Sequence, residues 1–486
     1  MPGDSAVEEV ELPGGYTLMV RGPGIVELLE GEVEVFGARI SRGRRLQVPE
    51  GRVLPLEAIS DSFLRSSAEP GEVVKGSTVP NSWAELAEEA LEARKILVIG
   101  ANDTGKSSLV LYAANRAARE GRRPAIVDAD VGQSDVGPLG TIGMAILREP
   151  APTYSELEPA DAYFVGDKSP VGHLLPMIVG SRLMVDEALE AGAAPVLVNT
   201  TGLVEGSVGW ALKVHKIEAL RPDLLVLIER ESELEHIARS APRDVKIVRL
   251  RPPASMRKDR GWRMRYRAAN LSSLAARRAP IELDLRSLRV LNASSLVLEE
   301  DAELARRLEV AAGVRPVAAG RFGEEAVAVF RDRLEQQSFS YASAVLRSYG
   351  EPRIVTLDRL VGLYMGLLDG RGRFAGVGRM TDLDLRSGAL RGEAAFIGAR
   401  DVGGVVFGYL ILDDQWQEMG SIRPGYFRSD RSISKYVFST GFQSIPSSRA
   451  ISLRPCTPMA ASAASSSTNV PRPSTSSRVT MAAPTR

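Results

Sequence analysis

The chain has 486 residues and a formal net charge of zero at pH 7, with 44% hydrophobic and 25% charged residues. These values are ordinary for a globular chain of several domains. No apolar run approaches the roughly 20 residues that span a bilayer, and no basic-then-apolar signal opens the chain, so we expect a cytoplasmic protein without a membrane partner. The single cysteine, Cys456, excludes a disulfide framework, and three dispersed histidines, His173, His215 and His236, do not predict a zinc site.

Because the net charge is zero, any polyanionic partner must be bound by a local basic patch. Arginine outnumbers lysine several-fold in this chain. A GC-rich genome or a hot habitat accounts for part of that bias, but arginine also suits bidentate contacts with phosphate.

The sequence predicts three folded domains and a tail. Residues 1–76 alternate apolar and polar side chains between glycine and proline turns, which predicts a small N-terminal β-domain. Residues 77–275 alternate strands with helices, which predicts an α/β domain with a parallel sheet covered on both faces. Residues 276–428 predict a C-terminal β-rich domain with one or two helices. Residues 429–486 are rich in serine, alanine, proline and threonine, so we expect a disordered tail; a frame-shifted or read-through end explains the composition equally well.

Six short apolar runs predict the strands of the α/β domain. They are residues 96–99, 125–127, 163–165, 196–198, 224–228 and 246–250. A helix is expected over residues 83–94, and a second helix should follow a glycine turn and run through residue 119.

The first predicted strand of the α/β domain is followed by a complete phosphate-binding loop of the pattern G-x-x-x-x-G-K-S. The loop and the residue after it are Gly100, Ala101, Asn102, Asp103, Thr104, Gly105, Lys106, Ser107 and Ser108. Its glycines allow backbone N–H groups to surround a phosphate, and the following helix adds its positive N-terminus. We expect Lys106 to contact the β- and γ-phosphates of a nucleotide and Ser107 to coordinate Mg²⁺.

Two carboxylates, Asp128 and Asp130, end the next predicted strand, where a doubly wound sheet binds its ligands. Their spacing of two predicts a common strand face. One would hold Mg²⁺ through water and the other would orient an attacking hydroxyl. The spacing does not decide which aspartate has which role.

A basic stretch, residues 257–267, follows the last strand of the predicted sheet. Its arginines could close over the transferred phosphoryl group as a lid, and Trp262 and Tyr266 could stack on a base. No Asn-Lys-x-Asp guanine motif or helicase-like motif occurs, which argues against a GTPase and against an ATPase motor.

Taken together, these motifs resemble the polynucleotide 5′-hydroxyl kinase family. The family includes archaeal RNA kinases, the kinase subunit of the eukaryotic pre-mRNA cleavage factor and a ribosomal-RNA-processing kinase. The matching segments are residues 128–142, similar to an extended Walker B segment, residues 163–170, residues 199–204, at the place of the family's clasp, the arginine run, and residues 27–37 of the N-terminal domain. The resemblance covers about residues 15–270, and residues 276–425 only in general character.

The resemblance implies a P-loop kinase core between an N-terminal β-sandwich-like domain and a C-terminal β-rich domain. It implies transfer of the γ-phosphate of ATP or GTP, with Mg²⁺, to the 5′-hydroxyl end of RNA, single-stranded or duplex, and leaves DNA open as an alternative acceptor. Asp130 would face the hydroxyl and leave Asp128 for the metal, while Gln133 would contact the RNA end. Arg257 and Arg260 would act from the lid. The N-terminal domain would help to hold the nucleotide base.

The clasp departs from the eukaryotic pattern Thr-x-Gly-Trp, whose tryptophan stacks on the terminal base. Here Thr201 and Gly202 are followed by Leu203. Base–aromatic stacking is worth about 1–3 kcal/mol per base, so terminal-base binding should be weaker here. Trp210 could substitute, although core packing is the favoured interpretation of that residue.

Two other functions remain open from the sequence. Some members of the family bind ATP without turnover and serve as scaffold subunits of RNA-processing complexes. A small-molecule P-loop kinase is the third interpretation. The oligomeric state is not predicted.

Overall fold

The computed structural model describes residues 7–253, 260–293, 296, 298–397 and 401–423. All of them fall within one compact unit, Met1–Arg431. No helix in this described part is both long and apolar enough to cross a membrane. The expected tail, residues 429–486, lies outside the described residues, and the expected domain boundaries stay predictions.

The N-terminal residues form two antiparallel sheets that share one core. The first has the order β1 (Glu8–Leu12), β8 (Ser62–Ser66), β3 (Gly24–Glu30), β6 (Arg45–Val48). The second has the order β5 (Ala38–Ser41), β4 (Glu32–Val35), β7 (Val53–Ala58), β2 (Tyr16–Arg21), β9 (Glu69–Lys75). Alternate side chains of both sheets, such as Val20, Leu28 and Leu56, pack into one buried cluster. This is the sandwich that an alternating pattern favours.

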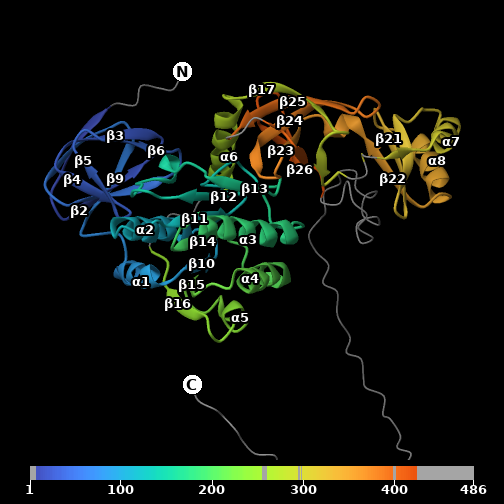
Figure 1. Cartoon of the computed structure of the whole chain (residues 1–486). Coiled ribbons are helices and arrows are strands. Elements are labelled where there is room, and N and C mark those ends of the chain that lie inside the picture. The colour runs from blue at the N-terminus through green and yellow to red at the C-terminus, as the bar shows by residue number, and fades with distance from the viewer. Residues whose placement is uncertain (1–6, 254–259, 294–295, 297, 398–400, 424–486) are drawn as a thin grey trace, which may run out of the picture. The chain divides into compact units, whose positions relative to one another are not determined.

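The central sheet has seven strands (Figure 1). Their order is β13 (Asp161–Phe164), β12 (Thr141–Ile146), β11 (Ala125–Ala129), β14 (Val196–Thr200), β10 (Lys95–Gly100), β15 (Leu224–Ile228), β16 (Lys246–Leu250). The last five are parallel to one another, whereas β12 pairs antiparallel with both β11 and β13. The expected parallel sheet is therefore mixed at this edge, where β12 runs in the opposite direction. Residues 130–140 contain no crossover helix, so the chain returns from β11 in the opposite direction.

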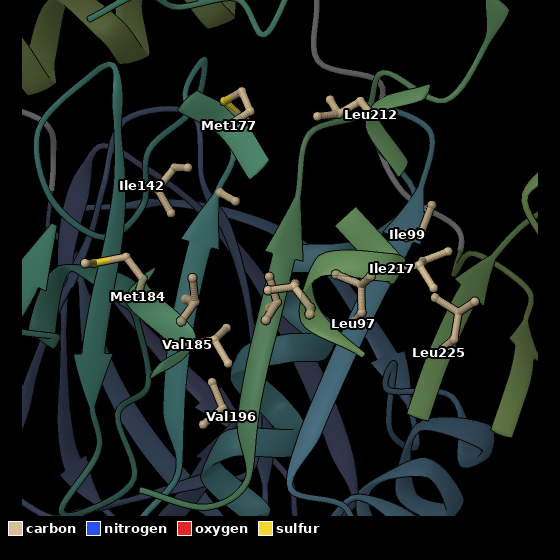
Figure 2. Packing of buried hydrophobic residues seen from close by; sticks show 14 of the residues in the cluster. Leu97, Ile99, Ile142, Met177, Met184, Val185, Val196, Leu212, Ile217 and Leu225 are labelled. Carbon is tan, nitrogen blue, oxygen red and sulfur yellow. The ribbon is translucent and has the colours of Figure 1, made fainter. Parts of the chain in front are cut away.

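Helices cover both faces of the central sheet. One face carries α1 (Asn81–Glu92) and α2 (Lys106–Arg119), and the other carries α3 (Leu174–Glu190), α4 (Gly206–Leu220) and α5 (Glu235–Ala238). Strand β10 serves both cores by alternation: Leu97 and Ile99 point to the α3–α4 side, and Ile96 and Val98 to the α1–α2 side. Figure 2 shows the core on the α3–α4 side, with Leu97 and Ile99 labelled.

The C-terminal part begins with α6 (Arg260–Ala275) and contains two further sheets. The larger has the order β17 (Ala279–Asp284), β25 (Ala389–Phe396), β24 (Phe374–Asp384), β23 (Leu363–Leu368), β26 (Gly404–Leu412), β18 (Arg289–Leu291), with β27 (Glu418–Ser421) paired to β26. The smaller comprises β19 (Glu299–Glu300), β20 (Ala318–Phe322), β21 (Glu325–Phe330) and β22 (Glu351–Thr356), beside α7 (Ala302–Ala312) and α8 (Gln336–Arg347). Short 3₁₀ helices occupy Tyr154–Glu156 and Leu357–Leu360. The predicted α/β fold with flanking β-rich parts is confirmed.

The larger C-terminal sheet shares a buried cluster with the α/β core. Leu139 and Phe164 of the core pack with Tyr364 and Leu410 of the sheet. The Tyr364 hydroxyl donates to the Leu139 carbonyl at 3.0 Å. At the same junction Gly166 lies against Gly408: a Cβ on Gly166 would be 2.6 Å from the Gly408 Cα. Only residues without a side chain allow the two backbones to approach this closely.

Candidate active site

The phosphate loop, residues 100–107, joins β10 to α2 as the sequence predicted. Its turn needs left-handed backbone at Asp103 (φ 60°) and Gly105 (φ 87°). Gly100 has no room for a side chain, since a Cβ there would lie 2.6 Å from the Thr104 hydroxyl. Lys106 is the first residue of α2. The loop therefore ends at a helix N-terminus, where N–H groups without helical partners bind anions.

The Lys106 side chain is folded back onto its own loop. Its Nζ atom donates to the Ala101 carbonyl at 2.6 Å, and the side chain is buried. Burial lowers the pKa of Lys106 to about 8, while the carboxylates of Asp130 and Asp103 oppose that shift. The Lys106 ammonium group therefore lies near the carboxylates of Asp103 and Asp130, at the position of a phosphate-binding lysine.

Asn199, at the end of β14, connects the loop to the first aspartate. Its Nδ2 atom donates to Ser107 Oγ at 3.1 Å and to Asp128 Oδ1 at 3.0 Å. Its Oδ1 atom is buried and has no hydrogen-bond partner among the described residues. A hydroxyl, a carboxylate and an unused amide oxygen in one place form the hard-oxygen environment that Mg²⁺ prefers, together with phosphates and waters. The residues present therefore fit Mg²⁺, although the described residues contain no cluster of three His, Cys, Asp or Glu ligands.

The two aspartates do not share a strand face, contrary to the prediction from their spacing. Strand β11 ends at Ala129, so Asp130 already belongs to the following loop. Asp128 is completely buried, and its Oδ2 atom accepts from the backbone N–H of Asp135 at 2.6 Å and of Val136 at 3.3 Å. Burial, reinforced by the neighbouring Asp130 carboxylate, raises the pKa of Asp128 to about 7.

Asp130 instead lines a cavity of ≈ 560 Å³ beside the phosphate loop. The cavity is also lined by Ala101, Asn102, Asp103, Gly132, Gln133, Lys168, Ser169, Pro170, Thr201, Gly202, Leu203, Val204, Glu205, Arg230, Arg263 and Arg267. The structure thus brings Gln133 and the three clasp residues together with the loop, as predicted. Asp128 is not among the lining residues.

Four cations, which we call the basic wall, line this cavity: Lys168, Arg230, Arg263 and Arg267. Arg263 on α6 pairs with Asp103 of the phosphate loop at 3.1 Å, and its Nε atom is buried without a hydrogen-bond partner among the described residues. The predicted lid residue Arg257 lies outside the described residues. Arg260 begins α6, but its side chain is not described. The predicted roles of these two arginines stay predictions.

The clasp, Thr201–Leu203, lies directly against the phosphate loop. A Cβ on Gly202 would be 2.0 Å from Asn102 Oδ1, which explains the glycine. Beneath the clasp, the buried Lys213 of α4 donates from Nζ to the Thr201 carbonyl at 2.6 Å and to its hydroxyl at 3.3 Å. Leu203 is half-buried, packs against the α3–α4 core and also lines the cavity.

The aromatic residues of the basic stretch do not face the cavity. Trp262 is buried and stacks on Tyr266, with ring centroids 5.3 Å apart, while the Arg52 guanidinium lies 5.0 Å from the Tyr266 ring centroid. The Tyr266 hydroxyl donates to Asp135 Oδ1 at 2.6 Å. These contacts attach α6 to the N-terminal sandwich, and neither ring lines this cavity, so the stacking of these rings on a base stays a prediction.

Trp210 also differs from expectation. Its side chain is exposed, with its Nε1 atom 3.2 Å from Ser240 Oγ, so it is not a core residue. It does not line the cavity either.

Two more cavities combine the N-terminal sandwich with α2. One, of ≈ 530 Å³, contains Ser107, Ser108, Arg52 and Phe36, and the other, of ≈ 160 Å³, contains Phe36 and Tyr112. Phe36 lines both, so this part of the sandwich borders both of these spaces beside α2.

Several residues of the site were missed by the sequence reasoning. Asn199 lies at the end of β14 and Arg230 follows β15, at the edge where a doubly wound sheet binds its ligands, and that rule could have found them. Arg263 and Arg267, by contrast, belong to the basic stretch that the sequence had singled out as a lid, and their spacing of four is that of one helix face. Lys168 lies in residues 163–170, which the sequence analysis matched to the family, but the sequence could not show that its side chain lines the cavity.

Comparison with known proteins supports this geometry. Residues 100–274 match the family described as "mRNA cleavage and polyadenylation factor CLP1 P-loop". The chain is 44% identical over 143 residues to the polyribonucleotide 5′-hydroxyl-kinase of Pyrococcus furiosus, a match covering 29% of this chain and only 40% of that protein. It is 29% identical over 362 residues to the enzyme of that name from Thermococcus kodakarensis, covering 71% of this chain and 96% of that protein.

A similarity of fold extends further. Clp1p, solved in a complex with Pcf11p, has a TM-score of 0.58 over 84% of this chain and 98% of its own, at 14% identity. Clp1 of Xenopus tropicalis is 28% identical over 272 residues, covering 51% of this chain and 62% of that protein. The resemblance predicted from the motifs is confirmed: residues 100–274 match the P-loop family model, and the chain is similar in sequence to several polyribonucleotide 5′-hydroxyl-kinases.

Proposed function

We propose that the protein transfers the γ-phosphate of ATP or GTP to the 5′-hydroxyl end of RNA. The observation that carries the proposal is Asp130, a carboxylate lining a cavity that is also lined by residues 101–103 of the phosphate loop and by the basic wall. A base, one side of the phosphate loop and cations for a polyanionic acceptor border this one space. The names of the relatives support the same reaction.

In the proposed step, the O5′ oxygen of the acceptor attacks the γ-phosphorus. The O5′–phosphorus bond forms, the bond from phosphorus to the β–γ bridging oxygen breaks, and that electron pair leaves with the nucleoside diphosphate. Asp130 accepts the hydroxyl proton. Lys106 leaves the Ala101 carbonyl for the β- and γ-phosphate oxygens, and Arg263 neutralises charge on the transferred group.

Ser107 and Asp128, oriented by Asn199, would hold Mg²⁺, which would neutralise charge on the β- and γ-phosphates. Asp128 would act through water, because its carboxylate is buried beneath the cavity. The nucleoside would occupy the space bordered by Phe36, which gives the N-terminal sandwich its role in nucleotide binding. The choice between ATP and GTP and the cytoplasmic location stay predictions.

The test is transfer of labelled γ-phosphate to four acceptors: a 5′-hydroxyl oligoribonucleotide, the same sequence as DNA, the 5′-phosphorylated oligonucleotide and a free nucleoside. We expect label on the first, none on the third, and loss of transfer when divalent cations are chelated. Label on the nucleoside alone would identify a small-molecule kinase. Nucleotide binding without transfer to any acceptor would support the scaffold function, which is consistent with a neighbour in fold having been solved as a complex.

A further inference from the structure

One residue of the C-terminal sheet contacts two side chains that line the cavity. Glu418, the first residue of β27, forms ion pairs with two members of the basic wall. Its Oε1 atom pairs with Lys168 Nζ, and its Oε2 atom pairs with Arg267 Nε at 3.2 Å. Lys168 comes from the loop after β13 and Arg267 from α6, so a single carboxylate joins three separate parts of the chain.

The three side chains of this group do not border the cavity equally. Lys168 and Arg267 line the cavity, whereas Glu418 does not. Glu418 accepts from the Nε atom of Arg267, so the two terminal nitrogens of the guanidinium lie outside this pair. The three side chains are 32%, 16% and 21% exposed for Lys168, Arg267 and Glu418, which means that solvent screens the pairs only in part.

The charge balance leaves the group positive. Two cations share one carboxylate, so one net positive charge faces the cavity. Without the carboxylate, the two cations would repel each other and their long side chains would regain rotamer freedom. Glu418 therefore holds Lys168 and Arg267 in place without cancelling their combined charge.

We propose that Glu418 is a positioning residue that fixes Lys168 and Arg267 as a binding site for a phosphodiester of the acceptor strand. The inference rests on the proposed function and deepens it. A free nucleoside offers a 5′-hydroxyl but no phosphodiester, so this site makes the enzyme select polynucleotides. The C-terminal sheet thereby contributes to substrate choice and does not only support the core.

The experiment compares Glu418→Gln and Glu418→Asp with the unmodified full-length chain. We expect Glu418→Gln to raise the KM for a 5′-hydroxyl oligoribonucleotide about tenfold, the effect of losing one charge-assisted contact, while kcat and the KM for nucleotide stay within twofold. Glu418→Asp should recover part of the loss. The slope of log affinity against log salt should become shallower by about one, because fewer counterions are released.

A matched control and a double-mutant cycle separate a positioning role of Glu418 from a purely structural one. Glu282 pairs with Arg391 at 3.2 Å on the same sheet, away from the cavity lining, so Glu282→Gln should leave every KM unchanged. In an Arg267→Met, Lys168→Met background, Glu418→Gln should have no further effect on oligonucleotide KM.

Three results would overturn the inference. A lower melting temperature with unchanged oligonucleotide KM would mean that Glu418 only stabilises the fold. A lower oligonucleotide KM would mean that Glu418 weakens the attraction of the two cations for the strand. If the unmodified chain transfers no phosphate, the proposed function fails, but oligonucleotide binding by fluorescence anisotropy still tests Glu418. In that assay, equal affinities for the Glu418→Gln variant and the unmodified chain would contradict the positioning role.

Discussion

The backbone N–H of Asp130 donates to the Oδ1 atom of Asp128 at 3.2 Å, so the first carboxylate lies beneath the residue that carries the second. Asp128 accepts three further hydrogen bonds, from Asp135, Val136 and Asn199. The two carboxylates therefore differ in what they can still do: Asp128 orders the loop around it, and Asp130 is available to the cavity.

The first prediction separates these roles. Asp130→Asn should lower kcat by about 100-fold or more while nucleotide affinity changes little, because the lost proton acceptor acts only in the transition state. Asp128→Asn should instead lower the melting temperature, since an amide NH₂ would face donors and cost about 1–3 kcal/mol. Steady-state kinetics, nucleotide titration and thermal melts are the measurements. An intact fold with the larger kcat defect at Asp128 would reverse the assignment.

The second prediction concerns two buried lysines of α4. Lys216 Nζ is buried without a hydrogen-bond partner among the described residues, and burial lowers the pKa of Lys216 to about 7 from 10.5. Between these values the unfolded chain binds more protons, so the free energy of unfolding should rise with pH above about 7. Lys216→Met should flatten this rise and stabilise the protein at pH 7 by about 1–3 kcal/mol.

Lys213 provides the matched control, because its ammonium group has the Thr201 carbonyl and hydroxyl as acceptors. Lys213→Met should therefore destabilise the protein. Melting curves of both variants from pH 6 to 10 test the pair, and equal destabilisation by both substitutions would contradict the distinction.

A third prediction addresses the lid helix α6. Arg263 lines the cavity and pairs with Asp103, whereas Arg265 on the same helix is exposed and pairs with Glu50 at 3.0 Å. Arg263→Met should lower kcat/KM about 10- to 100-fold by removing charge from the phosphoryl site. Arg265→Met should have little effect, since exposed ion pairs contribute little. Equal kinetic losses in the two variants would argue against a specific role for Arg263.

A fourth prediction uses the clasp. Leu203 is half-buried and lines the cavity, so Leu203→Trp can place an indole there and should tighten binding of single-stranded 5′-hydroxyl RNA several-fold. The preference among terminal bases should flatten, because every base has a face for stacking. RNA titrations and thermal melts on the same variant test this. A lower melting temperature without tighter binding would mean that tryptophan overpacks the core.

Trp210→Ala is the control for this experiment. Trp210 is exposed and does not line the cavity, so its removal should change neither RNA affinity nor turnover.

The sequence predicted the parts of the site that local rules control. The phosphate loop is a contiguous pattern, and Asp130, Gln133 and Thr201 follow two neighbouring parallel strands, β11 and β14, whose carboxyl ends meet at one edge. Contacts between distant segments could not be predicted. Nothing near Glu418 indicates that it pairs with Lys168, and the burial of Trp262 depends on the sandwich beside it.

The strand-face prediction for the two aspartates failed for a related reason. Alternation holds only while the chain is extended, and β11 stops at Ala129. Trp210 shows the same limit in a helix: an apolar position on α4 could equally face the core or solvent, and only the packing of the neighbouring elements decides.

The close approach of Gly166 and Gly408 has a consequence for how this protein can evolve. A methyl group at Gly166 would lie 2.6 Å from the Gly408 Cα and push the C-terminal sheet away from the core, opening a junction that also buries Phe164, Leu271 and Tyr364. Gly408 cannot gain a side chain either, since a Cβ there would lie 2.6 Å from the Tyr364 carbonyl oxygen and 3.0 Å from that of Gly166. A catalytic core excised after Ala275 would expose this junction to water, so the core cannot be separated from the C-terminal sheet without exposing apolar surface.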